Sequence, residues 1–205
     1  MKQVEKTDPV PVAGKIERTR LKLVNAVRDE VKSSGDFNAE QVARRAGISP
    51  ATFYNHFATK DQALIAAYEN MMDNLVDLVA NRCRIEKLLD QGMHDFMAEW
   101  VLSTTGFFSE NASLFRLAQA AFGRSKDMRT LFREHEAAVI EHHRRFIELG
   151  QAARAIRQGN QLSMAQMLTV FSESWHHSLV QNLKAGDALH EELTRSLVRM
   201  LTPET

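Results

Sequence analysis

The sequence has almost no cysteine and no long hydrophobic run, and each absence excludes a class of protein. Cys83 is the only cysteine among the 205 residues, which excludes an intrachain disulfide and suits a reducing compartment. No apolar run approaches the roughly 20 residues that a membrane-spanning helix needs, and the N-terminus has no signal-peptide pattern. We therefore expect a soluble, cytoplasmic protein.

An excess of charge of either sign is also missing. Lys and Arg together number 26, and Asp and Glu together also number 26. The charges are unevenly placed, however, because residues 15–60 hold nine bases and five acids. This local surplus is modest, but it has the sign that contacts with nucleic-acid phosphates need.

What the sequence does contain is a helical pattern of apolar residues along nearly its whole length. Residues 1–14 lack this pattern and are predicted to form a flexible arm. The spacing predicts an all-α fold of about nine helices, with a small helix-turn-helix domain over residues 15–60 and a larger helical domain over residues 61–205. The predicted helices cover residues 15–34, 60–82, 85–103, 107–122, 127–156, 161–184 and 188–201, with two short ones inside residues 38–57.

Residues 38–57 predict two short helices joined by a tight turn. Gly47 can adopt a positive φ just past the end of the first helix, and Asn38 is suited to cap its start. Ser49 can cap the second helix, where Pro50 at the first turn gives up an N–H that has no helical partner. This pattern is typical of a helix-turn-helix that binds DNA.

The second short helix has one apolar face and one polar face. Phe53 and Phe57 are four residues apart and are predicted to pack in the core. The other side chains of this helix carry hydrogen-bonding groups without large charges, as a reader of the major groove requires. They are Thr52, Tyr54, Asn55 and His56.

The run VARRAGIS over residues 42–49, followed by TFYNHF over 52–57 and Lys60, resembles the TetR family of bacterial transcriptional regulators. The resemblance covers about residues 21–68, and it implies roles for single residues. Pro50, Ala51, Thr52 and Asn55 would face base edges. The remaining implied contacts are with the DNA backbone, from Asn38, Tyr54, His56 and Lys60. One departure is Glu30, which stands where the family usually has an apolar core residue.

The resemblance also implies a C-terminal cavity for a small-molecule effector. Its many Phe and Met residues would suit a largely apolar ligand, although such residues at helical spacing are more often plain core. The candidate lining residues are Phe96, Trp100, Phe107, Phe108, Phe115, Met167, Phe171 and Trp175.

The last two long helices are the predicted surface for pairing two chains. A stripe on residues 161–184 can bury against a partner, and pairing would supply the second DNA half-site that tight binding needs. This stripe consists of Leu168, Phe171, Trp175, Leu179 and Leu183. The expected mechanism is a homodimeric repressor of a pseudo-palindromic operator, released by its effector and without catalytic activity or cofactor.

Two alternatives remain. A protein of the same fold could answer to a protein partner rather than to a small molecule. The second alternative is a metal-dependent enzyme, because histidines gather on two predicted helices. His135, His142 and His143 lie on one of them, and His176 and His177 lie on another. His135-Glu136 lacks the second histidine of the zinc-protease pattern, and adjacent histidines rarely share one ion, so we expect no metal site. Cys83 lies between Arg82 and Arg84, which leaves a redox role open.

Overall fold

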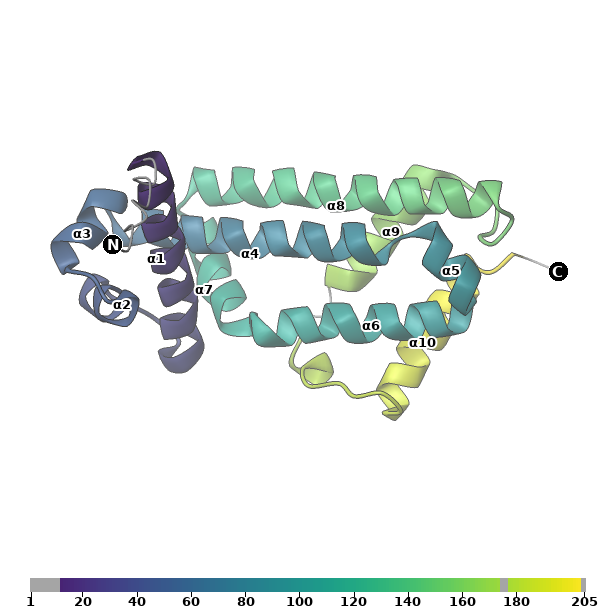
Figure 1. The fold of residues 1–205 in the computed structure, drawn as a ribbon. Helices are drawn as coiled ribbons and strands as arrows, with labels where there is room; N and C mark the ends of the chain where they lie inside the picture. Colours follow the sequence, from purple (N-terminus) through teal and green to yellow (C-terminus); the bar gives the residue numbers. More distant parts are fainter. Residues whose placement is uncertain (1–11, 174–176, 204–205) are drawn as a thin grey trace, which may run out of the picture. The chain divides into compact units, whose positions relative to one another are not determined.

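The computed structural model describes residues 12–173 and 177–203 and is built from helices (Figure 1). Within these residues there are ten α-helices and a short 3-10 helix over Ser178–Val180, and no strand. The all-α prediction is confirmed. The chain divides into two compact units, with the boundary between Ala67 and Tyr68, and each is described separately.

The first unit contains three helices and the start of a fourth. They are α1 (Val12–Ser34), α2 (Ala39–Ala46), α3 (Pro50–His56) and the first turns of α4 (Lys60–Arg82). Apolar residues of all four meet in one small core, where Leu23, Val27, Val42, Phe53 and Ala63 are at most 1% exposed. Helix α1 begins at Val12 rather than at Lys15, so it takes in the end of the predicted arm. The rest of that arm lies outside the described residues.

The second unit contains the remainder of α4 and six further α-helices. These are α5 (Ile85–Gln91), α6 (Met93–Glu110), α7 (Ala112–Phe122), α8 (Lys126–Ala152), α9 (Gln161–Glu173) and α10 (Ala188–Leu201). Helix α9 packs along α8, and α10 packs along α6. Gly150 lies at one close approach, where a Cβ would stand only 2.4 Å from the side chain of Ile156.

Several predicted helix boundaries in the second unit are wrong. The predicted helix over residues 85–103 is divided at Gly92 into α5 and α6, and α8 ends at Ala152 rather than at Ile156. Helix α6 runs through Thr104, Thr105 and Gly106, which the sequence pattern predicts as a break. It continues because the hydroxyls of Thr104 and Thr105 donate to carbonyls one turn back, those of Trp100 and Val101, and so leave the helical backbone intact.

The predicted helix over residues 161–184 is also wrong, because a 3-10 helix and turns, not an α-helix, occupy residues 178–184. The proposed pairing stripe changes accordingly. Leu168 is 1% exposed and packs inside its own chain, whereas Leu162, Met167 and Val170 are 48%, 43% and 66% exposed. Leu179 is exposed beyond α9 in the 3-10 helix, and Trp175 lies outside the described residues. None of the described helices is long and apolar enough to cross a membrane.

Candidate nucleic-acid interface and interior cavity

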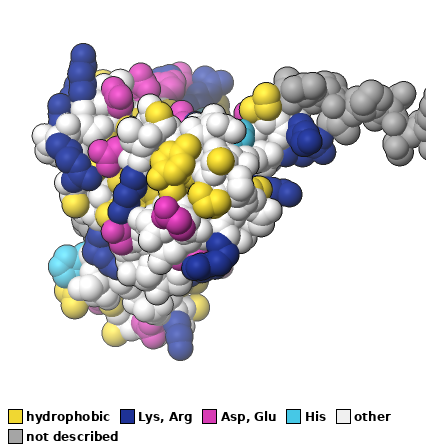
Figure 2. Space-filling view, turned by 90° about the vertical axis from the view of Figure 1, so that its left-hand side faces the viewer, with side chains coloured by type: hydrophobic (Ala, Val, Ile, Leu, Met, Phe, Trp, Pro, Cys, Tyr) yellow, Lys and Arg dark blue, Asp and Glu magenta, His cyan; other side chains and the backbone are white. Residues whose placement is uncertain are grey.

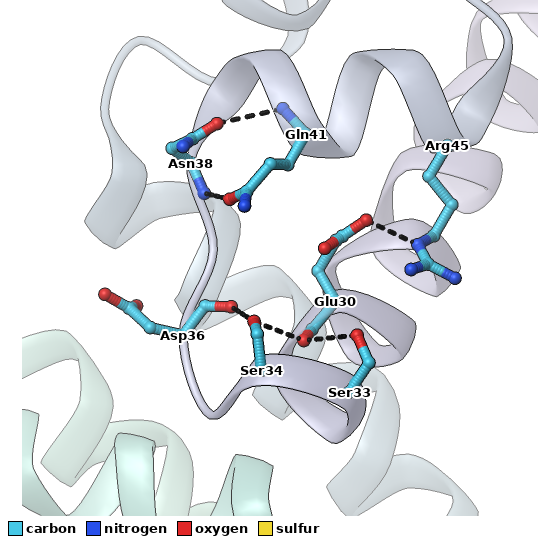
Figure 3. A network of polar contacts seen from close by, with 7 residues as sticks. All are labelled: Glu30, Ser33, Ser34, Asp36, Asn38, Gln41 and Arg45. Carbon is cyan, nitrogen blue, oxygen red and sulfur yellow. Dashed lines mark hydrogen bonds and ion pairs between the residues drawn. The ribbon is translucent and has the colours of Figure 1, made fainter.

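Reciprocal hydrogen bonds fix the start of α2 (Figure 3). The side-chain oxygen of Asn38 accepts from the N–H of Gln41 at 2.9 Å, and the side-chain oxygen of Gln41 accepts from the N–H of Asn38 at 3.0 Å. This is a capping box, which satisfies two backbone donors that a helix start leaves open. The cap uses only the oxygen of the Asn38 side chain, so its NH2 group can still donate to a phosphate.

Gly47 and Ser49 determine the turn between α2 and α3. Gly47 has φ 69° and ψ 36°, a left-handed conformation that costs a residue with a Cβ more than it costs glycine. The N–H of Ile48 then donates to the carbonyl of Ala43 at 3.0 Å, which closes the end of α2. Ser49 Oγ accepts from the N–H of Thr52 at 3.2 Å and so caps α3, with Pro50 at its first position.

Helix α3 is held by two aromatic side chains. Phe53 and Phe57 are 1% and 2% exposed, and their ring centroids lie 5.7 Å apart, so the predicted core packing is confirmed. The guanidinium of Arg20 on α1 lies 5.3 Å from the centroid of the Phe57 ring. The buried face of α3 therefore fixes which side chains point outward.

The outward face of α3 brings together four of the predicted DNA-binding residues. Pro50, Ala51, Tyr54 and Asn55 are exposed, and Tyr54 is 53% exposed although it is aromatic. Thr52 is half-buried because its hydroxyl lies 2.9 Å from Ser49 Oγ within the cap. His56 is also half-buried.

Figure 2 views the molecule from the side on which α2 and α3 lie in Figure 1. Hydrophobic side chains and white surface, which is backbone or uncharged side chain, occupy much of the middle of this face, with a few acidic side chains among them. Lys and Arg side chains lie mostly towards its edges. Phosphate contacts from such edge positions would leave the middle, where few side chains are charged, to meet the bases.

Lys60, at the start of α4, has an acidic neighbour that the sequence pattern did not reveal. Its Nζ lies 2.6 Å from Asp36 Oδ1, and it also lies 5.1 Å from the centroid of the Phe37 ring. The hydrogen bond from Lys60 lowers the pKa of the Asp36 carboxyl. A phosphate that binds Lys60 must therefore compete with this carboxylate.

A second ion pair joins α1 to α2. Arg45 Nε donates to Glu30 Oε1 at 2.6 Å, and the Glu30 side chain is only 9% exposed (Figure 3). The acidic residue at an otherwise apolar position is thus explained by its partner. Arg45 forms this bond although its side chain is 41% exposed, and Arg44 is exposed on the same helix.

The second unit contains a small interior cavity of about 40 Å³. Side chains from α4, α6, α7, α8 and α9 line it, and most are apolar or aromatic. The lining residues are Met72, Leu75, Val79, Trp100, Thr104, Phe108, Phe115, Phe132, Glu136, Val139, His143, Thr169 and Ser172. A space of this volume holds about one water molecule, so a larger ligand requires side chains to move.

Only some of the predicted ligand residues line this cavity. Trp100, Phe108 and Phe115 line the cavity. Phe96 instead stacks on Phe146, with ring centroids 5.2 Å apart. Phe107 and Phe171 are half-buried away from the lining, Met167 is exposed on α9, and Trp175 lies outside the described residues.

The polar residues of the lining include three that sequence reasoning missed as site residues: Glu136, His143 and Thr169. His143 is fully buried, and burial lowers its pKa to about 3, so the ring is neutral at physiological pH. Burial raises the pKa of the Cys83 thiol, which disfavours the reactive thiolate. No group of three or more potential metal ligands lies close together among the described residues.

Comparisons with known proteins agree with the helix-turn-helix geometry. Residues 35–67 match the model of the bacterial regulatory proteins of the tetR family. A search of curated proteins found no match.

Solved structures share the whole fold at low sequence identity. Salmonella enterica GusR is 17% identical, with a TM-score of 0.69 over 97% of this chain and 99% of its own. A protein from Mesorhizobium loti, assigned to the TetR family, is 16% identical, with a TM-score of 0.72 over 90% of this chain and 95% of its own. A TetR regulator from Haloarcula marismortui is 11% identical, with a TM-score of 0.71 over 90% and 98%. Residues 35–67 of this chain therefore carry the segment that marks the bacterial regulatory proteins of the tetR family, and the chain has the fold of TetR-family transcriptional regulators.

Proposed function

We propose that the protein is a homodimeric repressor that binds a pseudo-palindromic operator and leaves it when a small, largely apolar effector binds. The observation that carries this proposal is the outward face of α3. It holds Pro50, Ala51, Tyr54 and Asn55 exposed on a helix whose opposite face is fixed by Phe53 and Phe57.

The chemistry of this face suits the major groove. Asn55 can form two hydrogen bonds with adenine, and the apolar surfaces of Pro50 and Ala51 suit a thymine methyl. Tyr54 and His56 would bind the DNA backbone, as would Asn38 at the start of α2 and Lys60 at the start of α4. Thr52 would reach a base edge only through the part of its side chain that the cap with Ser49 leaves accessible.

Pairing of two chains is proposed to use α9 and α10. Leu162, Met167 and Val170 form an exposed apolar face on α9, and Leu189 on α10 is 39% exposed. Burial of such a face against a second copy is favourable, and it would place two α3 helices on two half-sites. We further propose that the protein acts in the cytoplasm and catalyses no reaction.

The effector site would be the aromatic cavity of the second unit. An effector that fits one spacing of the two DNA-binding units better than another would shift the equilibrium away from the DNA-bound state. The small volume of the cavity also favours a second candidate, a regulator of the same fold controlled by a protein partner.

Genome-wide mapping of bound DNA tests the proposal. A repressor of this kind should occupy a few sites that share a two-fold symmetric sequence near promoters. Occupancy without a shared sequence would contradict operator recognition. A purified protein that stays monomeric at micromolar concentration in light scattering would contradict the dimer. Co-purification of one protein that releases it from DNA would favour the second candidate.

A further inference from the structure

Two hydrogen bonds assign the tautomer of His143 on α8. Its Nδ1 lies 2.8 Å from Oγ1 of Thr169 on α9. That hydroxyl donates its single proton to the carbonyl of Ala165 at 3.0 Å, so towards His143 it can only accept. This hydrogen-bond assignment places the ring proton of the neutral histidine on Nδ1 and leaves a lone pair on Nε2.

This lone pair is buried and unused. His143 is 0% exposed and lines the cavity, and its Nε2 finds no hydrogen-bond partner within residues 12–173 and 177–203. A buried acceptor without a donor is unfavourable, so a molecule that brings a donor to it gains more than the bond alone.

Most of the neighbouring polar side chains also present acceptors to the cavity, although the Nε1–H of Trp100 is a donor in the same lining. The hydroxyls of Thr104 and Ser172 donate to the carbonyls of Trp100 and Leu168, at 2.7 and 2.9 Å. Glu136 also lines the cavity, and its carboxylate forms no ion pair with any described part of the chain. Both Nε2 of His143 and this carboxylate are acceptors, and the carboxylate would repel an anionic ligand.

The lining and the volume of the cavity restrict the chemistry and the size of the rest of the ligand. Trp100 packs edge-on against the His143 ring, with centroids 5.4 Å apart, and Phe108 and Phe115 add further aromatic surface. The volume of about 40 Å³ must grow to admit one ring, and Met72 is the kind of flexible side chain that can yield.

We propose that the effector is a compact, non-anionic aromatic molecule whose polar end is a hydrogen-bond donor, and that Nε2 of His143 accepts this hydrogen bond. This inference rests on the effector-controlled function proposed above. His143 would then discriminate between effectors, with Thr169 as the residue that positions its ring.

Matched probes test the donor requirement directly on the full-length protein by calorimetry. Phenol should bind about tenfold more tightly than anisole, and indole more tightly than 1-methylindole by a similar factor, because the methylated probes leave Nε2 unpaired. Benzylamine and benzyltrimethylammonium both carry a positive charge, but only benzylamine donates. Their comparison separates the donor from attraction to Glu136.

Variants of His143 test whether this residue causes the difference in affinity between the paired probes. His143→Phe should reduce the ratio of phenol to anisole affinity to about one, and His142→Phe, on the neighbouring half-buried position, should retain it. His143→Gln is a second variant in case the first fails to fold, and its amide, which both donates and accepts, should narrow the ratio. Equal affinities within each pair, a ratio unchanged in His143→Phe, or no binding of any probe at millimolar concentration would overturn the proposal. So would a water molecule held on Nε2 that no probe displaces.

Operator binding is measured in parallel, so that the two proposals can fail separately. Sequence-specific DNA binding without any probe binding would leave the repressor standing and remove the donor-bearing effector. Probe binding with the predicted ratios but no sequence-specific DNA binding would support the donor-bearing ligand of the cavity and contradict the repressor.

Discussion

The two ion pairs of the first unit offer a controlled test of how burial changes the value of a charge pair. Arg45–Glu30 and Lys60–Asp36 have the same N–O distance, 2.6 Å. Their exposure differs, since the side chains of the first pair are 41% and 9% exposed and those of the second are 48% and 61% exposed. Any difference in their contributions to stability should therefore follow from the burial of Glu30.

The expected magnitude follows from these exposures. Breaking a fully buried pair costs about 3–5 kcal/mol, because the remaining charge has no partner, whereas exposed pairs contribute about 0–1 kcal/mol. Arg45 is partly solvated, so Arg45→Met should destabilise the first unit by about 2 kcal/mol. Lys60→Met should cost less than about 1 kcal/mol. Adding Glu30→Leu to Arg45→Met should recover most of the loss, because it removes the stranded carboxylate.

Amide hydrogen exchange on the full-length chain gives a readout confined to the first unit. The amides of Val42 and Ala43, buried on α2, should lose protection in Arg45→Met and regain it in the double variant. Equal losses for Arg45→Met and Lys60→Met, or no recovery in the double variant, would refute the argument from burial.

Three further predictions concern charge, pH and assembly. Asp36→Asn should raise operator affinity several-fold, because Lys60 becomes free to bind a phosphate. The slope of log affinity against log salt concentration should become steeper by about one released ion. Fluorescence anisotropy over a salt series measures both quantities, and Asp61→Asn is the control. The folded pKa of His143, about 3, lies below its unfolded value, so the protein should lose stability as pH falls from about 6.5 towards 3, by about 2 kcal/mol at pH 5. Thermal melting should show a weaker pH dependence in His143→Phe than in wild type. Val170→Glu should shift the protein from dimer to monomer in light scattering, whereas Leu89→Glu, at an exposed leucine on α5, should leave it dimeric.

The helix-turn-helix could be predicted from sequence because its signals are local. Gly47 at the turn, Ser49 and Pro50 at the helix start, and the spacing of Phe53 and Phe57 each act within a few residues. The structure confirms each of these local roles. Contacts between elements distant in sequence gave no such signal, and the pairing of Lys60 with Asp36 is one that the pattern did not reveal.

The interior of the second unit depends on long-range contacts and was predicted less well. His143 and Thr169 are 26 residues apart, and nothing in the sequence near either one indicates their hydrogen bond. The aromatic residues of helices share a periodicity whether they line a cavity or fill a core, so the pattern did not separate Trp100 from Phe96. The sequence pattern predicts a break at Thr104 and Thr105, because the hydrogen bonds of their hydroxyls to the helix's own backbone cannot be seen in the sequence.

The central claim is that the outward face of α3 reads base pairs, and selection from a random DNA library tests it most directly. Wild-type protein should enrich a two-fold symmetric sequence. Asn55→Ala should keep the half-site spacing but lose preference at particular base pairs, whereas Tyr54→Phe should weaken binding to all sequences alike. A wild-type protein that enriches no sequence, or an unchanged selected sequence and affinity in both variants, would contradict the assignment of α3 to the major groove.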